Sequence, residues 1–490
     1  MKKLFAMLLM PLFFLLPNPV AAQPGYEMGI TDSQQYTEVV YIGGSPVVFR
    51  GTVKIATKQK GSSAQTSLTY KLTGGTKADT LSRSVKLDST ITQNESQERY
   101  DTKLSSITES IQVAGQKLKL NKEGNFFTAS KVIDHTAAVD YYTENWSMRR
   151  SYTVGTNVYL ITLEGAGITE GYSNAWGQGS TTTSDMRATS LDLGSNLTAW
   201  EGAVSSVDNA VTGRDLRYLA SRPELTSFSG GFLDESNSEE SINVNYDLPK
   251  VTAGIADNAT RNRGSLSLNM KTPPAQRRLF VGQFKDIKGH WAQTQIEAMS
   301  GLGAFSVKGD FFGPGYAARR EDLARGLAVV TNLVKDEPAK KNVSTRKQPA
   351  APQDFVDVPP TAPNYKYIQA VYTRGAMKGT NAGVFSPYKE ITRAEAATVL
   401  TNALGMKRYA PAPNAPAPTP FVDDADIPAW ARESVYIASQ IGLMRGEQGS
   451  FRPNDVMTRA ELAVMLDNYR QYLNQDFRKA YRDRLYTFKS

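Results

Sequence analysis

A unit that recurs three times in the second half of the chain constrains the fold more than any other feature of the sequence. Each copy opens with Phe-x-Asp, and the openings are Phe284-Lys285-Asp286, Phe355-Val356-Asp357 and Phe421-Val422-Asp423. An apolar stretch with helical spacing follows, then a loop, an aromatic-plus-proline signature and a second helical stretch. Tandem copies of one helical unit predict a repeat architecture.

The start of the second helical stretch carries the chemistry of the unit. The three starts are Ala318-Arg319-Arg320-Glu321, Thr392-Arg393-Ala394-Glu395 and Thr458-Arg459-Ala460-Glu461. Thr-x-x-Glu is a capping box, which predicts that the helix begins at the arginine. An arginine there is disfavoured by about 0.3–1 kcal/mol, because it faces the positive end of the helix dipole. Its repetition has two interpretations: an anion site for a carboxylate or phosphate, or a salt bridge to the unit's own aspartate.

The three units resemble S-layer homology (SLH) domains. Ile391-Thr392-Arg393-Ala394-Glu395 matches the core motif of that family in full, and Met457-Thr458-Arg459-Ala460-Glu461 nearly so. The resemblance covers about residues 283–472 and implies an all-α domain whose units form a pseudo-threefold bundle with ligand grooves between them. It also implies non-covalent binding to secondary cell-wall polysaccharide, through ends of pyruvylated N-acetylmannosamine. The carboxylate of that sugar fits the anion interpretation.

The resemblance implies which residues line the grooves. They are the arginines Arg319, Arg393 and Arg459, the aspartates Asp286, Asp357 and Asp423, the tryptophans Trp291 and Trp430, and the loop glycines Gly379 and Gly446. For the tryptophans, stacking on a sugar and burial in the core stay open as alternatives. The first unit departs from the pattern, because Ala318 replaces the capping threonine. The second unit has Pro363 where the tryptophan is expected.

The first half of the chain follows a different pattern. From about residue 23 to 271, apolar and polar residues alternate with period two, as in Ile242, Val244, Tyr246 and Leu248. Gly43-Gly44 between two such runs predicts a tight hairpin. We therefore predict a mainly-β domain of antiparallel sheets with one solvated face, arranged as a sandwich or a long meander. It resembles no family that we recognise.

This half offers little catalytic chemistry. It contains no Gly-x-Ser-x-Gly, no His-Glu-x-x-His, no P-loop and no dinucleotide fingerprint. Glu144, Glu201 and the acidic stretch 234–240 are candidates for a carboxylate pair that cleaves glycosides, although a solvated loop is the simpler interpretation of the stretch. We predict no enzyme, cofactor or metal site. The alternative is a polysaccharide-active hydrolase that the repeats tether to the wall.

The amino-terminal residues predict export. Lys2 and Lys3 precede an apolar run from Leu4 to Leu16, and small residues follow at 20–22, as in a cleaved signal peptide. The run is shorter than the ~20 residues that span a bilayer, so no membrane span is expected after cleavage. The chain has no cysteine, which excludes disulfides, thiolate metal sites and a cysteine nucleophile. A net charge of +8 over 490 residues is no argument for nucleic acid, but it suits an anionic polymer.

These patterns predict a multidomain chain. The predicted parts are a signal peptide at 1–22, a β-rich domain at 23–275, repeats at 283–334, 354–408 and 420–472, and a basic helical tail at 473–490. Pro- and Ala-rich linkers separate the repeats. We predict a secreted bacterial surface protein, held in the cell wall or S-layer by the repeats and displaying the β-rich domain.

Overall fold

The computed structural model describes most of the two predicted regions. The described residues are 29–32, 35–42, 44–94, 96–113, 115–154, 159–219, 231–252, 255–307, 309–334, 354–405 and 419–476. The predicted signal peptide, the first linker, most of the second linker and residues 477–490 of the predicted tail lie outside this set.

The first region is one antiparallel 15-stranded sheet, called here the sheet module. Its strands are β1 (Gly29–Asp32), β2 (Gln35–Val40), β3 (Val47–Lys60), β4 (Ser63–Thr73), β5 (Thr80–Asn94), β6 (Gln97–Val113), β7 (Gln116–Leu120), β8 (Phe126–His135), β9 (Val139–Val154), β10 (Tyr159–Asn174), β11 (Gly177–Asp192), β12 (Leu197–Leu219), β13 (Gly231–Thr252), β14 (Ile255–Lys271) and β15 (Ala275–Leu279). Nearly every strand pairs with the next one in the chain, so the meander is the observed arrangement. β15 runs past the predicted boundary at 275.

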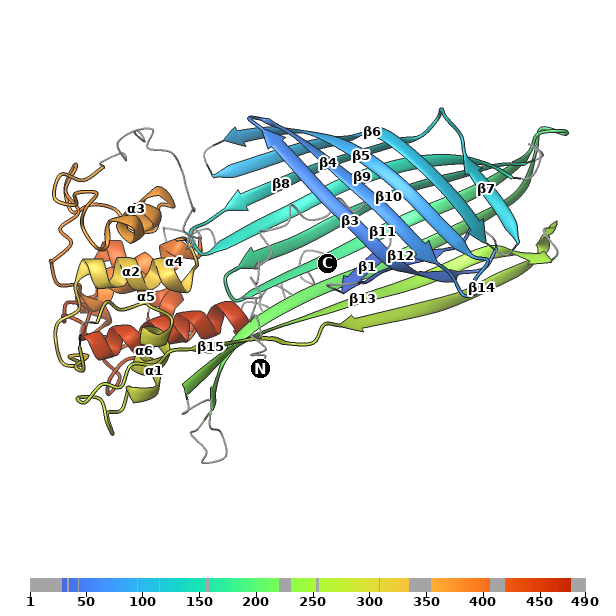
Figure 1. Ribbon diagram of the computed structural model, residues 1–490. Helices are drawn as coiled ribbons and strands as arrows, with labels where there is room; N and C mark the ends of the chain where they lie inside the picture. The colour runs from blue at the N-terminus through green and yellow to red at the C-terminus, as the bar shows by residue number, and fades with distance from the viewer. Residues whose placement is uncertain are drawn as a thin grey trace, which may run out of the picture.

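The sheet curls around its apolar face. Along β5, for example, Leu81, Arg83, Val85 and Leu87 point inward, and the alternate residues Ser82, Ser84 and Lys86 are exposed. The curl brings β1 close to β13 and β14, the other end of the strand order (Figure 1). The period-two alternation therefore correctly predicts which residues of a strand face the interior and which face solvent. The single sheet buries one of its faces against itself, whereas a sandwich would need two sheets.

A cluster of charged side chains lies inside the curled sheet. The Arg83 guanidinium contacts Glu38 at 3.0 Å and Glu109 at 2.6 Å, and the Tyr152 hydroxyl donates to Glu109 at 2.8 Å. Burial alone would raise the pKa of Glu109, but Arg83 and Arg150 outweigh it and hold that pKa below its usual range. These charged side chains bind one another because the backbone N–H and C=O groups of the strands are already hydrogen-bonded between strands.

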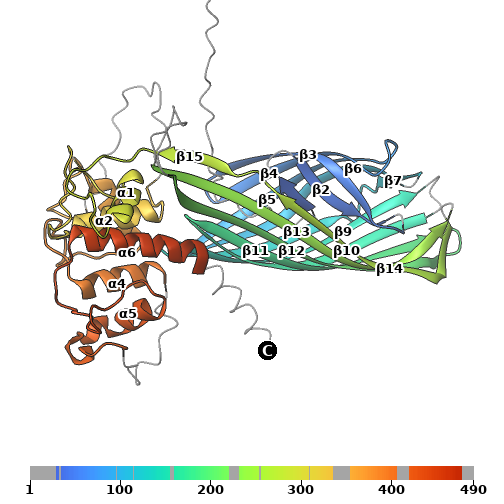
Figure 2. The ribbon, with the colours of Figure 1, turned by 90° about the horizontal axis from the view of Figure 1, so that it is seen from below.

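The second region is helical. Its elements are α1 (Gln293–Gly301), α2 (Arg320–Val330), α3 (Tyr365–Thr373), α4 (Arg393–Ala403), the 3-10 turn η2 (Asp424–Asp426), α5 (Ala429–Gln440), α6 (Arg459–Gln471) and the π-helical turn η3 (Tyr472–Asp476). All of them lie at one end of the sheet module (Figures 1 and 2). Among the described residues, no helix is both long enough and apolar enough to cross a membrane. The prediction of a mainly-β first region and a helical repeat region is confirmed.

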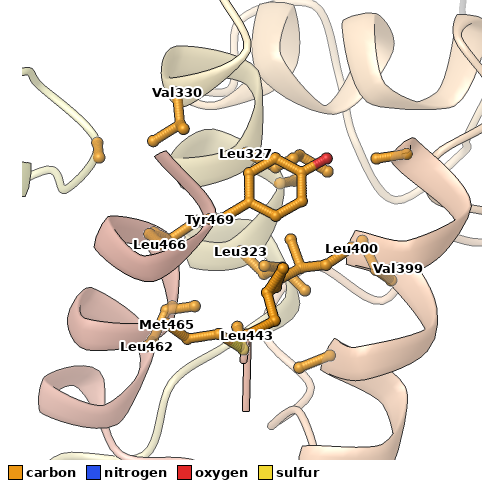
Figure 3. Packing of buried hydrophobic residues seen from close by; sticks show 14 of the residues in the cluster. Leu323, Leu327, Val330, Val399, Leu400, Leu443, Leu462, Met465, Leu466 and Tyr469 are labelled. Atoms are coloured by element: carbon orange, nitrogen blue, oxygen red, sulfur yellow. The ribbon is translucent and has the colours of Figure 1, made fainter. Parts of the chain in front are cut away.

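The second helix of each repeat packs against the other two. Leu323 and Leu327 of α2, Leu400 of α4 and Leu466 of α6 are completely buried and point toward one another (Figure 3). At Gly326 of α2, an added Cβ would lie 2.3 Å from Leu466, so only glycine permits this approach of the two helices. The three units therefore share one core.

Candidate functional site

The opening aspartate of each repeat holds the aromatic loop of the same repeat. The Asp286 carboxylate accepts the backbone N–H groups of Phe312 at 2.9 Å and of Gly313 at 2.7 Å. The same pair of bonds joins Asp357 to the amides of Phe385 and Ser386, and Asp423 to the amides of Phe451 and Arg452. The repeated Phe-x-Asp thus supplies the acceptor that two loop amides need.

These loops have an unusual backbone conformation. The second amide donor in each loop has positive φ: 73° at Gly313, 56° at Ser386 and 56° at Arg452. Only glycine adopts such angles without strain, so the carboxylate bonds hold the two other loops in this conformation.

The bonds also change the acidity of the aspartates. Burial by itself would raise the pKa of Asp286 and of Asp423, but the two loop amides on each carboxylate outweigh it and lower both pKa values. A positive charge on the preceding repeat's arginine acts in the same direction, Arg459 on Asp286 and Arg393 on Asp423. These aspartates are therefore fixed anions at neutral pH.

The helix-starting arginines hold the same loops from the other side. The Arg393 Nε donates to the Phe451 carbonyl at 2.7 Å, and its Nη2 donates to the Arg445 carbonyl at 3.0 Å. The Arg459 Nε donates to the Phe312 carbonyl at 3.1 Å. Each arginine thus reaches the loop of the following repeat, and the arginine of the third repeat reaches back to the first.

In the first repeat this position belongs to Arg320 and not to Arg319. The Arg320 Nε donates to the Phe385 carbonyl at 3.0 Å, and its Nη2 donates to the Lys378 carbonyl at 2.7 Å. Helix α2 begins at Arg320, and Arg319 is its exposed N-cap residue, whose guanidinium lies 5.7 Å from the Tyr388 ring centre. The predicted helix start is therefore wrong by one residue in this repeat.

A ring of backbone hydrogen bonds fixes this register. The amide of Ala318 donates to the carbonyl of Met457, Met457 donates to Ile391, and Ile391 donates back to Ala318, at 2.8–3.0 Å. Ala318 therefore corresponds to Ile391 and Met457, and not to the capping threonines. The paired arginines at 319 and 320 hide this shift in the sequence. Aligning the apolar residue before the cap would have revealed it.

The amides at the helix starts already have partners. In α4 the first three amides donate to the carbonyls of Asp455 and Pro453 and to the Thr392 hydroxyl. In α6 the first amide donates to Tyr316 and the second to Pro314. The amides that an anion site at these helix starts would use are thus already bonded, to the neighbouring repeat or to the capping threonine. Arg393 and Arg459 do not bind the opening aspartate of their own repeat. They bind backbone carbonyls of the following repeat, and each also lies near a helix carboxylate there: Arg393 is 3.8 Å from Glu461, and Arg459 is 3.3 Å from Asp322.

The two predicted tryptophans lie on the surface. Trp291 is 67% exposed at the approach to α1, and Trp430 is 58% exposed in the first turn of α5. Of the two open alternatives, burial in the core is thereby excluded. Four further aromatic side chains are exposed among the described residues of the repeats: Phe311, Tyr316, Tyr372 and Tyr388.

The two predicted glycines lie where their own loops are tightly packed. A Cβ at Gly379 would lie 2.5 Å from the Val384 carbonyl oxygen, and one at Gly446 would lie 2.9 Å from the ring of Phe421. Contacts inside the repeat are therefore sufficient to require glycine at both positions.

The carboxylates proposed for glycoside cleavage do not form a pair. Glu144 on β9 is 2% exposed and faces the interior of the sheet, whereas Glu201 on β12 lies on the outer face and binds Arg187 at 2.6 Å. The acidic stretch 234–240 is part of strand β13, so its interpretation as a loop is wrong. Its first carboxylate, Asp234, binds Arg214 and Arg277. Arginines on the neighbouring strands neutralise carboxylates of this acidic run, so the run can form part of a sheet.

Comparisons with known proteins agree with the repeat pattern. The S-layer homology domain family matches residues 283–324, 354–397 and 420–463. The chain is 29% identical over 201 residues to the S-layer protein EA1 of Bacillus anthracis, covering 40% of this chain and 21% of that protein. It is 29% identical over 185 residues to an S-layer protein of Bacillus licheniformis, covering 37% and 19%. It is 31% identical over 139 residues to an endoglucanase of Bacillus sp. (strain KSM-635), covering 28% and 14%.

The matches confirm two predictions. The chain carries three S-layer homology domains, and its predicted location at the cell surface or in the wall is supported. The chain spans about a fifth or less of the length of these relatives.

Proposed function

We propose that this protein is held non-covalently on secondary cell-wall polysaccharide by its three repeats and presents the sheet module at the cell surface. The observation that carries the proposal is a loop that recurs in all three repeats. In each, the repeat's own aspartate accepts two loop amides, and an arginine of the preceding repeat donates to a loop carbonyl, as Asp357 and Arg320 do in the second repeat. The contacts run from repeat 1 to 2, from 2 to 3 and from 3 to 1. This cyclic order is what a pseudo-threefold bundle with three equivalent boundaries requires.

Within this proposal the predicted residues divide into two groups. Arg393, Arg459 and the three aspartates shape the boundaries between repeats, since their polar atoms bind loop backbone. The exposed tryptophans offer flat faces on which a sugar ring stacks. Arg319 is the one predicted arginine whose side chain is exposed, and it lies beside the ring of Tyr388. We assign this pair the recognition of a pyruvyl carboxylate at the boundary between repeats 1 and 2.

Several weak sites acting together account for firm anchoring. When one repeat boundary is bound, the polymer's other chain ends are held near the remaining boundaries. The effective concentration of the second site then raises the apparent affinity by about 10²-fold or more over one site.

The test is sedimentation of the full chain with isolated wall polysaccharide. The double variant Trp291→Ala/Trp430→Ala removes only exposed rings, so we expect the fold to persist and binding to weaken by about tenfold or more. Tyr218→Ala is the matched control, because that ring is exposed on the sheet module. Equal pelleting of the double variant and the unmodified chain would refute the assignment of the tryptophans.

A second variant tests the carboxylate site separately. Arg319→Gln should weaken binding to pyruvylated polymer and leave binding to depyruvylated polymer unchanged. Arg217→Gln, an exposed arginine on β12, serves as its control. If Arg319→Gln weakens binding to the two polymers equally, Arg319 does not recognise the pyruvyl group.

A further inference from the structure

The sheet module meets the carboxyl-terminal end of the second helix in all three repeats. The Trp176 Nε1 donates to the Val330 carbonyl of α2 at 2.7 Å. The backbone amide of Ala138 donates to the Ala403 carbonyl of α4 at 2.8 Å. The Asn174 side-chain amide donates to the Leu473 carbonyl, just beyond α6, at 3.2 Å. The last carbonyls of a helix have no partner inside the helix, so the sheet module supplies a cap to each repeat.

Trp176 is the centre of this contact. Its side chain is 1% exposed, and two guanidinium groups lie over its ring, Arg214 of the sheet at 4.5 Å and Arg470 of α6 at 5.2 Å. The Arg470 Nη1 also binds the Asp215 carboxylate of β12 at 2.9 Å. One tryptophan thus contacts α2 through its N–H and α6 through its ring.

The contact continues an apolar core. Side chains from the near end of the sheet belong to the same buried cluster as the helix residues: Ala137, Ala138, Val139, Tyr172, Trp176, Leu216, Phe232 and Leu279. At α4 the fit is close, since a Cβ on Gly405 would lie 2.6 Å from the Thr136 side chain. The sheet module is therefore packed into the repeats and is not merely attached to their amino-terminal end.

The two ends of the repeat bundle are closed by different means. At the helix starts, the backbone ring of Ala318, Ile391 and Met457 joins the three repeats directly. At the helix ends, each repeat is bonded to the sheet module, and α6 runs up to the sheet edge (Figure 2). The sheet module thus bonds helix ends that lie far apart in the sequence, at Val330, Ala403 and Leu473.

We propose that the sheet module is the structural cap of the wall anchor. It binds one helix end from each repeat and so keeps the three repeat boundaries in one arrangement. The sheet module and the repeats accordingly move as one rigid body on the cell surface. This proposal concerns the fold of the chain and does not depend on which polymer the repeats bind.

Hydrogen exchange on the full-length protein tests the proposal. In Trp176→Ala we expect amides at the ends of all three helices, around residues 331–333, 404–405 and 469–473, to exchange about tenfold faster or more. The ring amides at 318, 391 and 457 should change less. Trp200→Ala is the control, because Trp200 is buried in the sheet core and belongs to a cluster without repeat residues.

A milder variant covers the case in which Trp176→Ala fails to fold. Trp176→Phe keeps an aromatic ring beside the two arginines, but removes the five-membered ring of the indole and with it the N–H that caps α2. It should loosen the α2 end most, with a smaller effect at α4 and α6. Faster exchange confined to α2 in both variants would overturn the proposal, as would unchanged exchange at all three ends.

Discussion

The sheet module and the repeats differ in what their buried charged side chains mainly bind. Inside the sheet, Arg83 binds the carboxylates of Glu38 and Glu109, so side chain meets side chain. In the repeats, the short bonds of Arg393 are to backbone carbonyls, with Glu461 farther away at 3.8 Å, and Asp423 binds backbone amides. In a sheet, the backbone N–H and C=O groups of neighbouring strands bind one another. Buried charged side chains there must therefore pair with other charged side chains. Loops leave backbone groups without partners, and charged side chains supply them.

This difference explains why the repeats are readable in the sequence. Each loop needs one carboxylate and one guanidinium at fixed positions, so an aspartate and an arginine recur at the same spacing in every repeat. The sheet cluster draws its members from distant strands, and each charged residue alone looks like a surface residue.

The largest expected effect is in the sheet cluster. Glu109→Gln leaves Arg83 and Arg150 with less compensating charge inside the sheet. We expect the free energy of unfolding to fall by about 3–5 kcal/mol, measured by urea denaturation. Glu164→Gln, an exposed partner of Arg149, should cost about 1 kcal/mol or less. Similar losses in the two variants would show that the cluster is not held as described.

The next effect is in a repeat loop. Asp423→Ala removes the acceptor of the Phe451 and Arg452 amides and leaves Arg452 at positive φ without support. Two charge-assisted hydrogen bonds are lost, so we expect the repeats to be destabilised by about 3 kcal/mol. Helical circular dichroism during urea unfolding measures this. Asp426→Ala, on an exposed residue of η2, is the control.

A smaller effect should distinguish the arginines at the repeat boundaries from the exposed Arg319. Arg393→Lys keeps the charge but cannot reach the Phe451 and Arg445 carbonyls together, which should cost about 1–2 kcal/mol. Arg319→Lys should leave stability within about 0.5 kcal/mol, since Arg319 is exposed. If the two substitutions cost the same, the division into boundary-shaping and exposed arginines fails.

Acid should weaken the repeats through their aspartates. The pKa values of Asp286 and Asp423 are lowered in the folded chain. Their stabilisation is therefore fully present above the unfolded pKa, about 4, and is lost as pH falls through the folded values. In Asp286→Asn, the helical circular dichroism signal should therefore fall less between neutral and acid pH than in the unmodified chain. An unchanged acid profile would show that other groups control it.

Much of the architecture could be predicted from particular residues. The alternation through Ile242 to Leu248 predicts a strand and its buried face, and Thr458 with Glu461 predicts the start of α6, where both capping bonds form. The curl of the sheet could not be predicted, since alternation does not say what covers the apolar face. The role of Arg320 was missed because its neighbour Arg319 fits the motif equally well. Trp176 gives no signal, since its partner Val330 lies 154 residues away.

Direct binding of the unmodified chain to wall polysaccharide tests the functional account most directly. The measurement is an equilibrium titration against purified polymer, before and after chemical removal of its pyruvyl groups. The account predicts saturable binding to the native polymer and a loss of about 10²-fold or more after removal. Equal affinity for both polymers, or no binding to either, would contradict it.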